Sequence, residues 1–338
     1  MINISTVSRL FVVSVGGTIA FTITGLNTAQ AATFSSVNIF GDSLSDPGNV
    51  FNLSGGLFPP PPYVQGHFSN GDIWTDYLAD DLGLNPTPYT SVIPSTEGVN
   101  YAFGGATSGT ENIFYLFNPA LTGLPGVQTQ VDLYTQQNKS ADSNGLYVLL
   151  AGANDYTYGG VDINGTQGVV NNLSSAINNL YSVGARNFLV GNLPNLSKTP
   201  LGSSNPGLKD TVQEHNTLLN QEIKDLNQSL FNSNIALFDV NKLFEDVINK
   251  PDEYGLTNVK NQCFSATSVP VFLCSNPDEY LFWDDFHPTT KGHKLIADAA
   301  YATIEKKFKP VPEPSTVLAL TGLGLGLLLL KKNKIPTS

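Results

Sequence analysis

The sequence predicts an α/β fold in which a parallel sheet is covered by helices on both faces. Two observations lead to this prediction. Short apolar runs rich in β-branched and aromatic residues recur along the chain, and each run stops at a glycine or a polar turn. Amphipathic stretches, with apolar residues three or four positions apart, separate the later runs. Strands that alternate with helices form right-handed βαβ units, and such units produce a parallel sheet.

Five apolar runs are the expected strands, and three stretches are the clearest helices. The expected strands are 37–40, 98–103, 146–150, 188–190 and 235–238. The expected helices are 169–183, 211–230 and 294–308. Ligands of parallel sheets bind at the carboxyl ends of the strands. The turns after the first three runs should therefore share one rim, which brings Ser43, Gly105 and Asn154 to one side of the sheet.

Composition indicates one globular domain, which we place at 32–310 between two terminal segments. Of the 338 residues, 41% are hydrophobic and only 13% are charged, which is typical of a folded chain. The formal charge is −11 and no basic stripe is present, so nucleic acid is not an expected partner. No cluster of residues has metal-ligand spacing, and we expect neither a metal nor a cofactor.

Residues 1–31 have the pattern of a secretory signal peptide. A polar start containing Arg9 precedes a broadly apolar run at 10–26, and Ala29-Gln30-Ala31 fits the small-residue rule for cleavage. An uncleaved anchor helix is the alternative, which the glycine, serine and threonine residues inside the run disfavour. We therefore expect the protein to be exported.

The C-terminal segment, 311–338, has a more distinctive pattern. Pro-Glu-Pro at 312–314 precedes an apolar run at 316–330 and two lysines at 331–332. The run is shorter than the ~20 residues of a comfortable membrane span. This order resembles the PEP-CTERM sorting tail of Gram-negative bacteria. The resemblance implies transient membrane anchoring through 316–330, processing by an exosortase-type protease, and a domain held outside the cytoplasm; a plain C-terminal anchor is the alternative.

The chain has two cysteines, Cys263 and Cys274, in one loop-like stretch. They show no CxxC spacing and have no nearby histidine pair, so they do not indicate a metal site. In an exported protein, a local disulfide between them is expected rather than two free thiols.

The first expected strand runs into Gly41-Asp42-Ser43, which is a candidate nucleophile turn. We expect this turn to open a helix. A serine hydroxyl attacks a carbonyl only when a base takes its proton, and the free N–H groups of a helix start suit a developing oxyanion. The alternative is that Asp42 or Ser43 merely caps a helix.

A candidate acid and base lie near the end of the domain. Asp284 and His287 are three residues apart, so one turn of chain can bring the carboxylate to the imidazole. A carboxylate on one ring nitrogen fixes the tautomer, and the other nitrogen can then serve serine as base. Asp285 is the competing acid. The alternative is a surface loop that caps the last helix.

Histidine is scarce, with four in the chain. His215 falls in an expected amphipathic helix and His293 falls near the start of the last helix, so both are expected to be structural. His67 lies in a turn-rich loop near the first strand, where it could line the site.

Two further turns can supply oxyanion donors. The second expected strand ends at Gly104-Gly105, where glycine permits close backbone approach. The third is followed by Gly152-Ala153-Asn154, whose amide is a neutral donor suited to a tetrahedral intermediate. A tight turn and a helix cap are the respective alternatives.

Together the four turns resemble the GDSL/SGNH hydrolase superfamily in order and spacing. The motifs are Gly-Asp-Ser-Leu at 41–44, Asn and Gly at 100 and 105, Gly-Ala-Asn-Asp at 152–155, and Asp-Asp-Phe-His-Pro at 284–288. The resemblance covers most of 36–305 and implies a three-layer, flavodoxin-like α/β/α sandwich with a five-stranded parallel sheet. It implies Ser43 as nucleophile and first oxyanion donor, Gly105 and Asn154 as further donors, His287 as base and Asp284 as its orienting acid.

The flanking sequence at 40–49, 66–71 and 280–284 is similar to the lipase/hemolysin branch of that superfamily. The branch also holds plant GDSL lipases and bacterial glycerophospholipid acyltransferases. It usually has arginine where this sequence has His67. The difference leaves the expected catalytic set intact but weakens any expectation of a contact with an anionic headgroup.

The expected function is that of an exported serine esterase or lipase. Its substrates would be acyl-lipid or short-acyl esters, cleaved through an acyl-serine intermediate, with water favoured over another alcohol as acceptor. One alternative, suggested by the sorting tail, is deacetylation of an extracellular polysaccharide on the same fold. A second is a non-catalytic surface or matrix protein, which the intact motifs disfavour.

Overall fold

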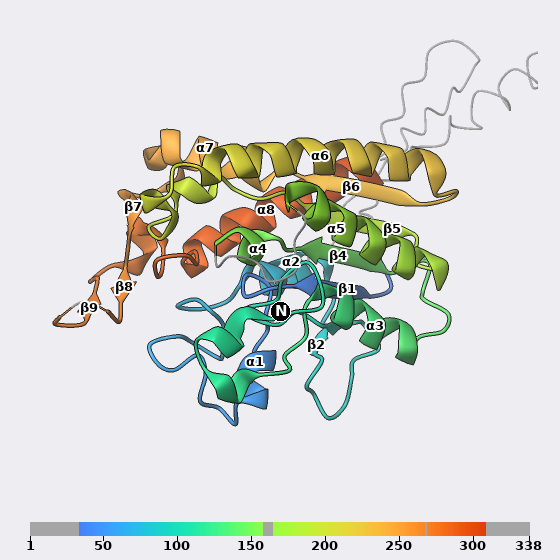
Figure 1. Ribbon diagram of the computed structural model, residues 1–338, viewed down its shortest axis with the longest axis horizontal. Coiled ribbons are helices and arrows are strands. Elements are labelled where there is room, and N and C mark those ends of the chain that lie inside the picture. The colour runs from blue at the N-terminus through green and yellow to red at the C-terminus, as the bar shows by residue number, and fades with distance from the viewer. Residues whose placement is uncertain (1–33, 158–164, 268, 309–338) are drawn as a thin grey trace, which may run out of the picture.

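A central parallel sheet organises the protein, as the sequence predicts (Figure 1). The computed structural model describes residues 34–157, 165–267 and 269–308, so the expected signal peptide and sorting tail lie outside the described residues. The six strands stand in the order β2-β3-β1-β4-β5-β6, and every neighbouring pair is parallel. Their bounds are β1 Val37–Gly41, β2 Thr87–Pro88, β3 Val99–Asn100, β4 Leu146–Leu150, β5 Asn187–Gly191 and β6 Asn234–Phe238.

The sheet has one strand more than the five that the family resemblance implied. The additional strand, β2, is a two-residue edge strand and contains Pro88. Proline has no N–H to donate, so it is tolerated in a sheet only where no partner needs that donor. A threonine and a proline also form no apolar run, which explains why the sequence pattern did not reveal this strand.

Helices cover both faces of the sheet, which makes three layers. One face packs against α2, α7 and α8, and the other packs against α3, α5 and α6. The bounds are α1 Asn49–Leu53, α2 Trp74–Leu82, α3 Val127–Gln137, α4 Ala153–Thr157, α5 Gly165–Ser182, α6 Leu208–Ser229, α7 Val240–Asn249 and α8 Thr290–Phe308. The short 3₁₀ helices are η1 Ile113–Leu116, η2 Pro119–Leu121, η3 Leu196–Lys198, η4 Gly202–Ser204, η5 Pro251–Tyr254 and η6 Pro277–Glu279.

Alternation along the strands explains the two cores. In β1, Ile39 belongs to the α2–α7–α8 core while Phe40 belongs to the other, since successive strand side chains point to opposite faces. In α5, the buried positions Val169, Leu173, Ile177 and Leu180 recur every three or four residues and face the sheet. Within the described ranges, no helix has both the length and the apolar character that a membrane crossing requires.

Two small sheets lie outside the central one. Strand β7 (Asn258–Gln262) pairs in parallel with β10 (Tyr280–Phe282). Strands β8 (Phe264–Ser265) and β9 (Phe272–Leu273) form an antiparallel hairpin, and a disulfide between Cys263 and Cys274 closes its base. The hairpin projects from the body at the left of Figure 1.

Candidate active site

The end of β1 and the segment between β10 and α8 bring a serine, a histidine and an aspartate into contact. Oγ of Ser43 is 2.7 Å from Nε2 of His287. Nδ1 of the same ring is 2.7 Å from Oδ2 of Asp284. The serine and histidine lie 244 residues apart in the chain, so the fold creates this contact. The result is a continuous relay from hydroxyl to carboxylate, which is the arrangement that activates a serine nucleophile.

Ser43 lies in a turn, and the helix expected to begin there starts later, at Asn49. Two features delay it: Pro47 cannot donate a hydrogen bond, and Gly48 has a φ of 103°. The carboxylate of Asp46 accepts the N–H groups of Gly48 and Asn49 at 2.9 and 2.6 Å. The expectation that a helix opens at Ser43 is therefore wrong, and Asp46 binds the N–H groups where the helix does begin.

Four hydrogen bonds hold the carboxylate of Asp284. They come from the His287 ring, from the hydroxyl of Tyr63 at 2.7 Å, and from the backbone N–H groups of Phe286 and His287 at 2.8 and 2.6 Å. Burial acts to raise the pKa of Asp284, but the imidazole and these bonds outweigh it, and the pKa lies below its ordinary value. Asp284 therefore stays ionised beside the base. The competing acid, Asp285, does not make this contact.

His287 is prepared to accept a proton. Burial acts to lower its pKa, but the charge of Asp284 and the hydrogen bond to it, helped by the charges of Asp285 and Asp42, raise the pKa above the ordinary value. A base whose pKa is raised in this way holds the serine proton more readily. The backbone supports the segment, since Trp283 donates to the carbonyl of His287 at 2.8 Å.

The Gly104-Gly105 turn is fixed from two sides. The N–H of Gly104 donates to Asp46 at 2.8 Å, and its carbonyl accepts from the Asn112 side chain at 2.7 Å. Gly105 has a φ of +76°, and a Cβ there would meet Asn112 and Phe114 at 2.6 and 2.7 Å. Only glycine fits this position without movement of its neighbours.

Asn154 lies next to that turn. Its Nδ2 donates to the carbonyl of Ala106 at 2.9 Å, and its neighbour Asp155 accepts from the backbone and hydroxyl of Ser108 at 2.9 and 2.8 Å. An asparagine amide carries two N–H donors, and this bond uses one of them. The fold thus gathers Ser43, Gly105 and Asn154 at the carboxyl edge of β1, β3 and β4, as expected from the sequence.

Comparison with known proteins identifies the family. Residues 37–300 match the model of the GDSL-like lipase/acylhydrolase family. The chain belongs to this family. It is 31% identical over 296 residues to a thermolabile hemolysin of Vibrio parahaemolyticus, a match that covers 80% of this chain but 63% of the relative, just under two thirds of its length.

Two further relatives of this GDSL-family chain match over most of their length. A GDSL esterase/lipase of Arabidopsis thaliana is 28% identical, with 77% of this chain and 86% of the relative covered. A phosphatidylcholine-sterol acyltransferase of Aeromonas hydrophila is 27% identical, with 87% and 96% covered.

Three residues that support the GDSL site were missed at the sequence level. Tyr63, which bonds Asp284, follows four consecutive prolines at 59–62 and is 221 positions away. The side chain of Gln130 binds both the N–H and the carbonyl of Gly41, at 2.9 and 2.8 Å, and so fixes the strand end before Ser43. Asp46 fixes Gly104. Of the three, Gln130 had a usable signal, since it is a polar residue on the buried side of an amphipathic helix.

The ring of His67 has partners outside the relay. Its Nδ1 is 3.0 Å from the carbonyl of Gly71, and its Nε2 is 3.7 Å from the Asp76 carboxylate. The adjacent Phe68 is the residue that meets the site, with its ring centroid 5.4 Å from that of His287. In the described part of the chain, His67, Asp72 and Asp76 are the one group close enough to share a metal ion. The carboxylate of Asp76 there also accepts the N–H of Ile73 at the start of α2.

The other two histidines are buried and distinct from the relay. Nδ1 of His215 is 2.9 Å from the hydroxyl of Tyr156, and burial lowers the pKa of His215 to about 4. Burial likewise lowers the pKa of His293 to about 3. Both histidines are therefore neutral at physiological pH, as packed structural residues are.

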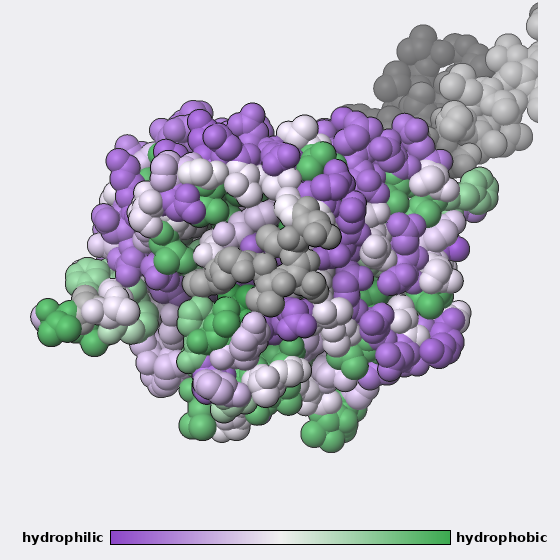
Figure 2. Space-filling model, viewed as in Figure 1, coloured by the Kyte–Doolittle hydropathy of each residue, from purple (hydrophilic) through white to green (hydrophobic). Residues whose placement is uncertain are grey.

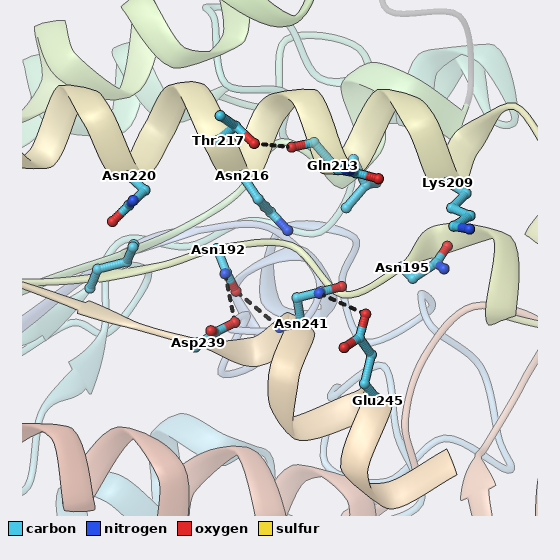
Figure 3. A pocket seen from close by; sticks show the side chains of 12 residues that line it. Asn192, Asn195, Lys209, Gln213, Asn216, Thr217, Asn220, Asp239, Asn241 and Glu245 are labelled. Carbon is cyan, nitrogen blue, oxygen red and sulfur yellow. Dashed lines mark hydrogen bonds between the residues drawn. The ribbon is translucent and has the colours of Figure 1, made fainter. Parts of the chain in front are cut away.

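A polar cleft of about 600 Å³ lies elsewhere on the same edge, between α6 and α7 (Figure 3). Amide side chains dominate its lining, and none of the relay residues contributes to it. Figure 3 shows Asn192 bonded to Asp239 at 2.8 Å and to the backbone of Asn241 at 3.0 Å. The Asn192 side chain thus ties the end of β5 to the end of β6.

Proposed function

We propose that this GDSL-family chain is a serine hydrolase that cleaves carboxylic esters. The observation that carries the proposal is the unbroken relay from Ser43 through His287 to Asp284, with 2.7 Å at both contacts. Its relatives, named as esterase/lipase, hemolysin and acyltransferase, support the same chemistry.

In the first half of the reaction, Nε2 of His287 takes the proton of Ser43 as Oγ attacks the ester carbonyl carbon. The carbonyl oxygen becomes an oxyanion, for which we assign the N–H groups of Ser43 and Gly105 and the amide of Asn154 as donors. When the intermediate collapses, the alkoxide leaves with the proton from His287, and an acyl-serine remains.

In the second half, water gives a proton to His287 and attacks the acyl-serine. The collapse of this intermediate returns the proton to Ser43 and releases the carboxylic acid. Asp284 stays ionised throughout, because its role is to orient the ring and stabilise the imidazolium.

Ser43→Ala tests the proposal. Hydrolysis of p-nitrophenyl acetate and butyrate should fall by about 10³-fold or more, because no other group takes the acyl chain. Ser203→Ala, which alters an exposed serine outside the relay, is the matched control and should keep full activity. A folded Ser43→Ala protein with wild-type activity would exclude the mechanism.

The acyl acceptor deserves a separate test, because the Aeromonas relative is named an acyltransferase. We propose water as the main acceptor, with a second alcohol as a competitor for the same acyl-serine. Products formed from an acyl ester in the presence of cholesterol would separate the two: free fatty acid supports hydrolysis, and a dominant yield of cholesteryl ester would contradict it.

We further propose that the domain acts outside the cytoplasm. The signal-like pattern of 1–31 and the PEP-CTERM-like pattern of 311–338, with an exosortase as processing partner, support this localisation. The disulfide between Cys263 and Cys274 is also typical of an oxidising compartment. Fractionation of a Gram-negative host tests it: the full chain should stay with the inner membrane, and deletion of 311–338 should release it to the periplasm. Recovery in the cytosol would contradict the proposal.

A further inference from the structure

Large apolar side chains are exposed in clusters on this protein. In the described residues, twelve are exposed, and nine of them fall on three segments, 47–71, 112–131 and 261–277. They are Leu53, Leu57 and Val64 on the first, Leu116 and Phe117 on the second, and Val269, Val271, Phe272 and Leu273 on the third. Figure 2 shows hydrophobic side chains at the projecting β8–β9 hairpin and over α1 at the lower edge. Such clusters mark interaction surfaces, whereas single exposed apolar residues do not.

The same three segments carry no charge. None of them contains aspartate, glutamate, lysine or arginine, although charged residues make up 13% of the chain. At that average, segments of this combined length would hold about eight charged residues. A surface that is both apolar and uncharged suits a partner that offers neither charges nor polar groups to match.

Aromatic contacts tie the three segments to the catalytic relay. Tyr63 of the first segment bonds Asp284 and lies 5.7 Å from Phe264 of the third, measured between ring centroids. Phe68 of the first lies 5.5 Å from Phe114 of the second and 5.4 Å from His287. The exposed apolar side chains therefore belong to segments that meet at the acid and the base.

The hairpin of the third segment has a firmly held base. A disulfide joins Cys263 to Cys274, the ring of Phe264 stacks on Trp283 at 5.6 Å, and the N–H of Phe264 donates to the carbonyl of Trp283. Trp283 immediately precedes Asp284. At the other end, Val269 is 98% exposed and Val271 is 62% exposed. An apolar tip thus projects from a hairpin whose base packs against the residue before the catalytic acid.

We propose that these three segments form a lipid-docking surface, in which the β8–β9 hairpin enters an uncharged lipid surface and presents its esters to Ser43. The inference rests on the proposed ester hydrolysis. The chain's charge of −11 disfavours an anionic surface, so the attraction is apolar. A protein partner seated on all three segments would cover side chains that contact the acid and the base, whereas a lipid surface is itself a source of substrate.

The first test locates the hairpin in the presence of lipid. Both cysteines of the chain are joined in the disulfide, so a new one can be labelled selectively in the full chain. A polarity-sensitive fluorophore on Val271→Cys should shift to the blue when phosphatidylcholine vesicles are added. The control is Phe231→Cys, which is 78% exposed but lies before β6, at the opposite edge of the sheet, and should not shift. Both variants keep 316–330, so the comparison of the two positions separates insertion of the hairpin from membrane binding by that tail.

The second test measures function. Val271→Asp with Leu273→Asp should lower hydrolysis of a fatty-acyl ester embedded in phosphatidylcholine vesicles by about tenfold or more. Hydrolysis of soluble p-nitrophenyl acetate should change less than about twofold, because neither side chain belongs to the relay. Phe231→Asp should leave both rates unchanged.

Three outcomes would overturn the docking surface: no shift at position 271, equal shifts at 271 and 231, or vesicle hydrolysis unaffected by the two aspartates. A change of oligomeric state in the aspartate variant with unchanged vesicle hydrolysis would assign the surface to a second copy of the chain. If soluble ester hydrolysis persists while docking fails, the proposed function stands. If docking occurs but neither substrate is cleaved, the proposed ester hydrolysis is wrong and the docking surface stands.

Discussion

The carboxyl edge of the sheet carries two polar regions, and they differ in the side chains that other segments bring to them. At the ends of β1 and β4, the segment that carries Asp284 and His287 reaches Ser43 and completes a relay. At the ends of β5 and β6, the α6–α7 cleft is lined by amides, and Asn192 and Asp239 bond each other. Position at this edge is common to both regions, so position alone does not make a catalytic site.

Two buried histidines, one in the relay and one near the cleft, have pKa values shifted in opposite directions. The ionised Asp284 outweighs the effect of burial and raises the pKa of His287. Near the second region, the structure shows the hydroxyl of Tyr156 bonded to His215, and burial lowers the pKa of His215 to about 4. An ionised carboxylate three residues away is therefore what raises the pKa of this buried histidine and makes it a better base.

Removal of that carboxylate should have the largest effect. In Asp284→Asn, kcat/KM for p-nitrophenyl acetate should fall by about 10³–10⁴-fold, because the ring loses its orientation and its counter-charge. The acid limb of the wild-type profile should lie above the ordinary histidine pKa of about 6.5 and move to lower pH in the variant. Asp285→Asn is the matched control. Equal losses in the two variants would contradict the assignment of the acid.

The buried His215 should make the folded protein less stable at acid pH. The pKa of His215 is about 4 in the folded protein and about 6.5 in the unfolded chain. Below pH 6.5 the unfolded chain binds the proton first, so the free energy of unfolding should fall as the pH drops from 6.5 to 4, by up to roughly 3 kcal/mol from this residue. Urea unfolding at pH 7 and 4.5 should show a smaller difference in His215→Gln. An identical pH dependence in variant and wild type would refute this.

Loss of one bond to the acid should have a moderate effect. Tyr63→Phe keeps the ring packing but removes one of the four hydrogen bonds to Asp284. We expect kcat to fall by about 3–10-fold with KM nearly unchanged, since the hydroxyl acts through Asp284 and does not bind substrate. A change confined to KM would indicate that Tyr63 contacts the substrate instead.

Changes in the amide-lined cleft should have the smallest effect. Lys209→Ala and Gln213→Ala alter exposed cleft residues and should change ester hydrolysis by less than about twofold. A loss above tenfold in either variant would show that the cleft takes part in the reaction and would remove the contrast between the two regions.

The fold and the relay could be predicted because their signals are local. Five of the six strands are apolar runs, and the sixth, β2, was missed because its two residues form no pattern. Ser43, Asp284 and His287 lie in two short motifs, and the rule for parallel sheets indicates the edge at which Ser43 lies.

The supporting contacts could not be predicted because they depend on long-range packing. Tyr63 reaches Asp284 from a loop 221 residues away, and Gln130 reaches Gly41 from α3 across 89 residues. No spacing in the sequence encodes such distances. The turn at Ser43 was expected to open a helix, but the helix begins at Asn49, after Pro47 and Gly48, and Asp46 binds its first N–H groups.

Covalent labelling tests the central claim most directly. The purified full chain, treated with a fluorophosphonate probe and mapped by mass spectrometry, should carry the label on Ser43, and His287→Ala should lose it because the serine is no longer activated. A folded protein that takes no label, or one labelled elsewhere regardless of His287, would contradict the account.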